Sequence, residues 1–169
     1  MPLTSQIVAY DPAWQARFEA EAQRLQTVFD SAALAIHHVG STSVPGLWAK
    51  LEIDILVVIA DITSITRFEG PMANLGYGAP VEMLPDHFYF RRNHQEKRTH
   101  KVHVCGPDHF SISEFLVFRD HLRSCAKARA DYEALKLKLE SENTQGILEY
   151  LEGKAPFIRA ALDRQQASS

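Results

Sequence analysis

The alternation of apolar and polar residues predicts two strands in the first third of the chain. Residues 33–39 (ALAIHHV) and 52–60 (EIDILVVIA) are short apolar runs bounded by polar or turn-forming residues, which is typical of strands. The second run is apolar on both faces except at Asp54, as expected for a strand in the middle of a sheet. The segment between them, GSTSVPGLWAK, is rich in Gly, Ser and Pro and is predicted to be a loop.

Apolar residues at three- and four-residue spacing predict helices elsewhere. The first covers residues 12–29 and follows Asp11, a suitable N-cap. A second is expected from Asp61 to about Gly76. From residue 111 onward the pattern is helical in three successive segments, and Pro156 is expected to kink or break the last of them.

Residues 87–92 (HFYFRR) and 100–106 (HKVHVCG) predict two more strands, joined by a polar stretch as in an antiparallel hairpin. In a strand, alternate side chains point to opposite faces. Three strands therefore each have an apolar face and a polar face. The polar faces carry Glu52 with Asp54, Arg91, and Lys101 with His103. If the apolar faces are covered by helices, these polar side chains line one cleft.

The elements together predict an α/β domain. The chain has 169 residues, which is enough for one domain with a proper core. We expect a small mixed β-sheet over about residues 1–110, with helices on its apolar face, and a C-terminal helical cap over about residues 111–165 that closes the cleft.

Composition and charge exclude several classes of protein. Hydrophobic residues make up 46% and charged residues 23%, as in ordinary globular proteins. The longest apolar run, residues 55–60, is too short to cross a bilayer, and the N-terminus lacks the pattern of a signal peptide. We expect a cytoplasmic location and no membrane contact. A net charge of -3 argues against a broad nucleic-acid-binding surface.

The polar residues predicted to line the cleft suit a phosphate-bearing ligand with a divalent cation. Carboxylate oxygens hold Mg²⁺, and Arg and Lys balance phosphate charge. Gly40 and Ser41 form a turn of small residues after a strand, where backbone N–H groups can approach a phosphate closely. Asp54 lies within an apolar strand, where an unpaired carboxylate is costly. Asp54 could be part of a metal or phosphate site, or it could form an ion pair with a nearby Arg or Lys.

The run HVGSTSVPGLWAKLEIDILV (residues 38–57) closely resembles the signature of the GrpB family. YDPAW, RTHKVHV, FRDHLR, DYEALK and YLEGKAPFI follow the family's order through nearly the whole chain. The resemblance implies a nucleotidyltransferase-like fold, and a domain that is also found attached to some dephospho-CoA kinases.

The resemblance also implies roles for residues of the loop and the strand after it. In polymerase-β-like nucleotidyltransferases a Gly-Ser turn contacts the triphosphate and a carboxylate pair holds Mg²⁺, which corresponds here to Gly40, Ser41 and Asp54. The second carboxylate is either Glu52 or is missing, because Leu56 stands at the alternative position. A third carboxylate, the usual general base, is replaced by other residues, among which His103 matches a histidine of the family and could act as base.

Two lysines of the helical half are further candidates for the phosphate site. Lys154 follows Tyr150 by four residues, matching a Tyr-Lys pair of the family, and Lys136 follows Tyr132 at the same spacing. Each lysine could close over a triphosphate or lie on a solvated helix. Arg91 is expected to contact the ligand, whereas Arg92, on the other face, is expected to be a solvated charge.

Three functions are compatible with these residues. The first is a Mg²⁺-dependent nucleotidyltransferase that moves a nucleotidyl group from a nucleoside triphosphate (NTP) to a hydroxyl acceptor. The second is a module that binds a nucleotide or other phosphate-bearing small molecule and has degenerate catalysis. The third is a metal-dependent phosphoesterase, which uses the same carboxylates and histidines.

Overall fold

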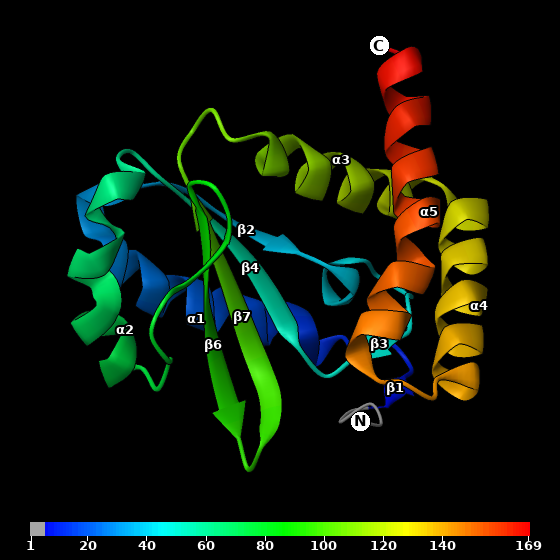
Figure 1. Cartoon of the computed structure of the whole chain (residues 1–169), viewed down its shortest axis with the longest axis horizontal. Coiled ribbons are helices and arrows are strands. Elements are labelled where there is room, and N and C mark those ends of the chain that lie inside the picture. Colours follow the sequence, from blue (N-terminus) through cyan, green and yellow to red (C-terminus); the bar gives the residue numbers. More distant parts are fainter. Residues whose placement is uncertain (1–5) are drawn as a thin grey trace.

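A five-stranded mixed sheet lies at the centre of the molecule (Figure 1). This computed structural model describes residues 6–169, so the first five residues of the predicted sheet-containing part lie outside it. The strand order is β2 (Ala33–Val39), β4 (Ile53–Ile59), β7 (Lys97–Cys105), β6 (His87–His94) and β5 (Val81–Leu84). Strands β4 and β7 are parallel, and the other neighbours are antiparallel. The four predicted strands are present, and the short edge strand β5 was not predicted.

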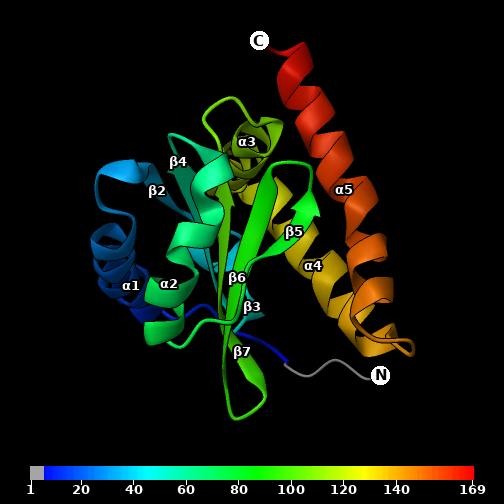
Figure 2. The ribbon, with the colours of Figure 1, turned by 60° about the vertical axis from the view of Figure 1, so that its left-hand side comes forward.

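Helices cover both faces of this sheet (Figure 2). One face carries α1 and α2, and the other carries the C-terminal helices, as the sequence predicts for an apolar face and a helical cap. The helices are α1 (Ala13–Phe29), α2 (Glu69–Asn74), α3 (Phe110–Ser124), α4 (Ala126–Glu142) and α5 (Ile147–Ala167). A second, two-stranded sheet pairs β1 (Ile7–Val8) with β3 (Ala49–Lys50). Short 3₁₀ helices are η1 (Asp30–Ala32), η2 (Ser41–Ser43) and η3 (Ile62–Phe68).

The main core fills the space between the sheet and the helices α1 and α2. Ile55 of β4, Val102 of β7 and Phe90 of β6 are fully buried there with Trp14 of α1 and Met72 of α2. Burial of this apolar surface is the main favourable term in folding, at roughly 25 cal/mol per Å². The strand alternation read from the sequence is therefore in the correct register.

The opposite face is less polar than the sequence predicts. Leu56 and Val58 of β4 and Cys105 of β7 pack on it against residues of α3, among them Phe115. Since α3 must bury its apolar side, it covers the half of the face that carries these residues. Polar residues remain on this face at the start of β4 and beside it, where Lys101 of β7 and Arg91 of β6 lie.

Local signals explain most element ends. Asp11 accepts a hydrogen bond from the backbone N–H of Ala13 at 2.9 Å just before α1, although the N-cap position is Pro12 and not Asp11 as predicted. The tip of the β6–β7 hairpin is formed by Gln95 and Glu96, both with positive φ, which matches the twist of antiparallel strands. Helix α5 runs through Pro156 without a break, contrary to the expectation that this residue could end it.

Arg92 is not a solvated charge but part of a buried network. Its two terminal nitrogens donate to the two carboxylate oxygens of Glu21 at 2.8 and 2.9 Å, and Tyr77 donates to the same carboxylate at 2.8 Å. Burial alone would raise the pKa of Glu21, but the hydrogen bonds from Arg92 and Tyr77 lower it below its ordinary value. This ion pair ties helix α1 to strand β6 through the core.

Replacing Arg92 with Met should destabilise the protein strongly. It leaves the Glu21 carboxylate buried without its cation, which typically costs about 3–5 kcal/mol. Urea denaturation of the variant measures this loss. The exposed neighbour Arg91 provides the control, because Arg91→Met should change stability by no more than about 0.5 kcal/mol; equal effects of the two substitutions would contradict the structural role of Arg92.

Candidate functional site

Asp54 lies at one end of a row of polar residues on three adjacent strands, β4, β7 and β6. The sheet register places Asp54 of β4 beside Lys101 of β7, and Lys101 beside Arg91 of β6. Residues directly paired in a sheet share a face. The structure therefore brings Asp54, Lys101 and Arg91 onto the face that the sequence predicts, and Leu56 and His103 form the next pair along the same face.

The turn after β2 lies directly against the Asp54 carboxylate. Gly40 has φ 72° and ψ -175°, a backbone region that is essentially restricted to glycine. A Cβ atom at Gly40 would lie 2.5 Å from Oδ2 of Asp54. The approach of the turn to the carboxylate therefore needs a residue without a side chain.

Lys136 joins the helical cap to this turn. Its side chain on α4 is 2% exposed, and its amine donates to Oγ of Ser41 at 3.1 Å and to the carbonyl oxygen of Trp48. The amine lies 5.1 Å from the centre of the Tyr132 ring, so the predicted four-residue spacing produces a cation–π contact. Burial and the charge of Lys154 lower the pKa of Lys136 to about 7.

Lys154 reaches the same region from α5. Its amine lies 4.6 Å from the centre of the Tyr150 ring, and the amine of Lys50 lies 4.1 Å from the same centre. Burial lowers the pKa of Lys154 to about 8, and burial also lowers the pKa values of Lys50 and Lys101. Lys50 was not predicted, although it stands only two residues before Glu52 in the sequence.

These four lysines gather positive charge that the protein itself leaves poorly neutralised. Within residues 6–169 no carboxylate oxygen lies within 4.0 Å of the amine of Lys50, Lys101, Lys136 or Lys154. Charged groups removed from water are normally paired. The site is consequently suited to an anion supplied from outside.

The two candidate metal ligands lie near each other. Burial raises the pKa of Asp54, and the charge of Glu52 raises it further, to about 7. Glu52 is also paired with Arg98, at 3.4 Å between Oε1 and a guanidinium nitrogen. In the described part of the chain, no three His, Cys, Asp or Glu side chains gather in a cluster that could hold a metal ion. The donor set thus fits Mg²⁺ only where ligand phosphates and water complete the shell.

His103 shares the face of Asp54 but lies beneath α3. It is 4% exposed, its ring centre lies 4.7 Å from that of Phe115, and its Nδ1 lies 3.0 Å from Nε2 of His87. Burial and the charge of Lys101 lower its pKa well below the ordinary value. The structure therefore places His103 behind the cavity wall, and it is His87 that lines the cavity.

Arg91 lies apart from the cavity that contains Asp54. Its guanidinium is 4.5 Å from the centre of the Tyr89 ring and donates to the Tyr89 hydroxyl at 2.5 Å. Both residues line a small separate hollow with Gly78 near β5. Lys101 lies between Arg91 and Asp54 in the sheet, so Lys101 and not Arg91 is the direct neighbour of Asp54.

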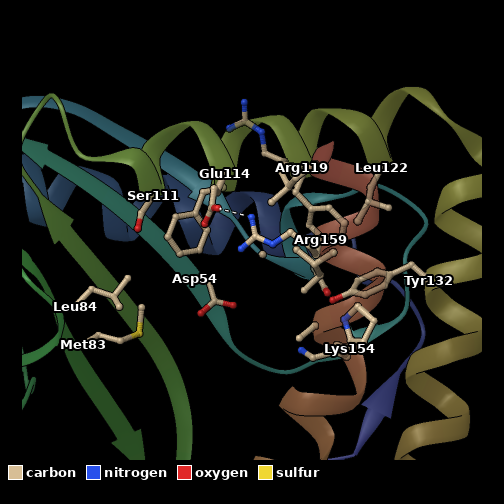
Figure 3. A pocket seen from close by; sticks show the side chains of 18 of the residues that line it. Asp54, Met83, Leu84, Ser111, Glu114, Arg119, Leu122, Tyr132, Lys154 and Arg159 are labelled. Carbon is tan, nitrogen blue, oxygen red and sulfur yellow. Dashed lines mark hydrogen bonds and ion pairs between the residues drawn. The ribbon is translucent and has the colours of Figure 1, made fainter. Parts of the chain in front are cut away.

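A cavity of about 750 Å³ opens between the sheet and the helices α3 and α5 (Figure 3). Gly40, Ser41, Asp54 and Lys154 line one part of it, and the rest is lined mainly by apolar residues of β5, α3 and α5. Arg119 and Arg159 also line it. Arg119 belongs to the family motif FRDHLR but was not among the predicted phosphate contacts, and Arg159 was not predicted. The volume is within the usual range of ligand pockets.

Comparison with known proteins identifies the family. The profile described as "GrpB protein" matches residues 4–164. The chain belongs to the GrpB family. It is 34% identical over 157 residues to the UPF0157 protein YqkA of Bacillus subtilis, with 92% of this chain and 46% of that protein covered. The chain thus spans about half the length of this relative.

A solved structure and a longer relative extend the comparison. The crystal structure of the conserved protein GrpB from Enterococcus faecalis superimposes with a TM-score of 0.85 at 33% identity, covering 94% of this chain and 96% of that one. A dephospho-CoA kinase of Mycolicibacterium paratuberculosis is 30% identical over 94% of this GrpB-family chain, which spans 45% of the kinase. The expected occurrence of the domain beside a dephospho-CoA kinase is confirmed.

The fold is that of nucleotidyltransferases. The chain superimposes with a TM-score of 0.54, at 15% identity, on Cid1, which is described as having RNA terminal uridylyl transferase activity. The two overlap over 82% of this chain and 43% of that one. At this identity the likeness shows a shared fold alone, which agrees with the predicted nucleotidyltransferase-like architecture. No helix in residues 6–169 combines the length and apolar character needed to cross a membrane.

Gly40→Ala should destabilise the protein more than Gly46→Ala. Both glycines have positive φ, and forcing a side chain into such a backbone costs about 1–3 kcal/mol. Only at Gly40 would the new Cβ also meet a carboxylate oxygen, whereas at Gly46 its nearest neighbour is Nε of Arg129 at 4.0 Å. Chemical denaturation of the two variants, alone and combined with Asp54→Ala, measures the difference; it should shrink when the carboxylate is removed.

Asp54→Asn should raise the stability of the ligand-free protein at alkaline pH. The folded-state pKa of about 7 lies above the unfolded value, so the wild type loses stability as pH rises between the two values and the full penalty is present above the folded pKa. The gain should be clear at about pH 8.5 and shrink towards about pH 5. Denaturation curves at both pH values test this, with the exposed Asp163→Asn as control; a loss of stability at both would make Asp54 a structural ion-pair partner.

Proposed function

We propose that the protein binds the phosphate groups of a small molecule, with an NTP as the candidate ligand, between the Gly40–Ser41 turn and the helical cap. The observation that carries this proposal is the set of four lysine amines, Lys50, Lys101, Lys136 and Lys154, without a carboxylate within 4.0 Å among the described residues. A polyphosphate supplies the missing negative charge.

The lysines approach the proposed phosphate site from different elements. Lys136 is fixed by its hydrogen bond to Ser41, so this residue orients the turn. Lys154 makes no hydrogen bond within residues 6–169 and has only its contact with the Tyr150 ring, so its amine remains available for a phosphate oxygen. We assign Lys136 to positioning Ser41, and Lys154 and Lys101 to contact with the ligand.

We assign Mg²⁺ to this site as its cofactor. Asp54 and Glu52 would hold it, and the ion would shield phosphate charge and orient the phosphates. The raised pKa of Asp54 supports this assignment, because a cation would stabilise the ionised carboxylate that burial disfavours. The third carboxylate of nucleotidyltransferases, the usual general base, has no counterpart on β7, where Lys101 and His103 stand.

Nucleotidyl transfer to a hydroxyl acceptor is the second candidate function. It is favoured by the fold and by the position of a carboxylate against the Gly40 turn. In such a transfer Ser41 and the lysines would hold the triphosphate, and Asp54 would lie closest to the reacting phosphate. The burial of His103 beneath Phe115 leaves it without access to an acceptor, which favours binding with degenerate catalysis over transfer.

Thermal shift with tripolyphosphate and with the common NTPs, each with and without Mg²⁺, tests the binding proposal. A ligand that binds only the folded state raises its apparent stability. Lys154→Met should weaken binding about tenfold or more, as expected for the loss of a hydrogen bond to a charged group. Lys138→Met, at an exposed position of α4, should bind as the wild type does. No shift with any of these phosphates would overturn the proposal.

Transfer is then separated from binding by measuring pyrophosphate. The wild type is incubated with a bound NTP, Mg²⁺ and a panel of small hydroxyl compounds. Pyrophosphate release that is lost in Asp54→Asn supports transfer, whereas phosphate binding without pyrophosphate release supports the binding module. Asp54→Asn must show the same cooperative unfolding transition as the wild type. A loss of pyrophosphate release then cannot be attributed to unfolding of the variant.

A further inference from the structure

The cavity beside Asp54 is much larger than a phosphate site requires. Its charged end is formed by Ser41, Asp54 and Lys154, and it extends from there to Met83 and Leu84 on the edge strand β5 (Figure 3). A phosphate group needs only the charged end. The remaining space lies along α3 and α5, and its lining is suited to a part of the ligand other than phosphate.

The remainder of the cavity is an apolar chamber. We define it by Met83, Leu84, Phe115, Phe118, Leu122 and Ile158, which all line the cavity. The charged side chains at its edge include Glu114 and Arg159, which are paired with each other at 3.2 Å. Glu152 and Arg119 also line the cavity, so its two acidic and two basic side chains outside the charged end balance in formal charge. The chamber therefore has little net attraction for a charged ligand.

The mouth of the chamber exposes apolar side chains to water. Met83 is 42% exposed and Leu84 is 37% exposed, and both belong to the edge strand β5. An apolar group that covered them would remove this surface from water, and the free energy gained grows with the area covered. The energetics therefore favour an aliphatic or other apolar occupant over water.

One continuous cavity thus combines a charged end with an apolar chamber. We propose that the chamber binds the apolar body of the second substrate or ligand of this site, an amphipathic alcohol whose hydroxyl end lies at Asp54 while the phosphate ligand lies at Lys154. This inference rests on the proposed function, because the phosphate site fixes which end of the cavity is polar. It names the class of molecule that meets the phosphate ligand: one with an apolar chain or ring system and a polar end.

A series of unbranched alcohols from butanol to octanol tests the chamber by titration calorimetry. If the chain enters the chamber, affinity should rise about two- to fourfold with each added methylene group. Saturating tripolyphosphate should leave the affinity for octanol unchanged or increase it, because the two ligands occupy different parts of the cavity. An affinity that does not depend on chain length, or competition between octanol and tripolyphosphate, would overturn the inference.

Variants of β5 make the test specific to the chamber. Met83→Glu places a charge at its mouth and should lower the affinity for octanol at least fivefold, since it removes the apolar contact of more than one methylene group. Val81→Glu is the matched control, because Val81 is similarly exposed on the same strand, at 47%, but does not line this cavity. Equal octanol affinity in Met83→Glu and the wild type would contradict the proposal. Should Met83→Glu fail to fold, Ala155→Trp fills the chamber from the exposed side of α5 and should have the same effect.

Failure of this inference is distinguishable from failure of the proposed function. Met83→Glu should keep the tripolyphosphate shift of the wild type, and Lys154→Met should keep the chain-length dependence for alcohols. If the wild type binds tripolyphosphate but its affinity for alcohols does not depend on chain length, the proposal that the chamber binds an apolar group is overturned and the proposed function is not. A wild type that binds alcohols with the expected chain-length dependence but gives no shift with any phosphate overturns the proposed function and leaves the apolar chamber supported.

Discussion

The contact between the Gly40 turn and the Asp54 carboxylate is the constraint on which the site depends. A Cβ at Gly40 would lie 2.5 Å from a carboxylate oxygen, so the turn and the strand can approach only because glycine stands there. The backbone of Gly40 is also held in a conformation that other residues adopt only at a cost. Once this contact is made, β2, the turn and β4 have fixed positions, and Asp54 faces the cavity.

The helical cap completes what the sheet begins. The sheet supplies Asp54 and Lys101, but Ser41 is held by Lys136 of α4 and the cavity is closed by Lys154 of α5. The lysines contact tyrosine rings and not carboxylates. Cation–π contacts stabilise a charge without cancelling it, so the amines remain able to attract an anion. The burial that lowers their pKa values and the burial that raises that of Asp54 have one cause, the closure of the cap over the sheet.

The two faces of the sheet serve different purposes. Toward α1 and α2 the strands are mainly apolar, and the charge of Arg92 is neutralised there by Glu21. Toward the cap, apolar residues near the ends of the strands bind α3, and polar residues near the start of β4 are left for the cavity. One face therefore stabilises the fold. On the other face, one part packs against α3 and the other part lines the cavity. This division explains why Asp54 and His103, whose residue pairs are only two positions apart in the register, have such different access to the cavity.

The sequence by itself determined the strands β2, β4, β6 and β7, the helices α1, α3, α4 and α5, the register and the family. These features depend on the alternation of apolar residues, on helical spacing and on a sequence motif. All three can be recognised in short stretches of the sequence, without knowledge of which elements are in contact. The helix expected from Asp61 to about Gly76 is instead the 3₁₀ helix η3 followed by the six-residue helix α2. Strand β5 escaped prediction because an exposed edge strand of four residues has little pattern. Only the tertiary structure decided that Lys101 and not Arg91 lies beside Asp54, that Phe115 covers His103, that Arg92 pairs with Glu21 across the core, and that an apolar chamber adjoins the charged end of the cavity. The first of these depends on the order of the strands, and the others depend on which helix packs over which part of the sheet. Both are decided by contacts between residues far apart in the sequence.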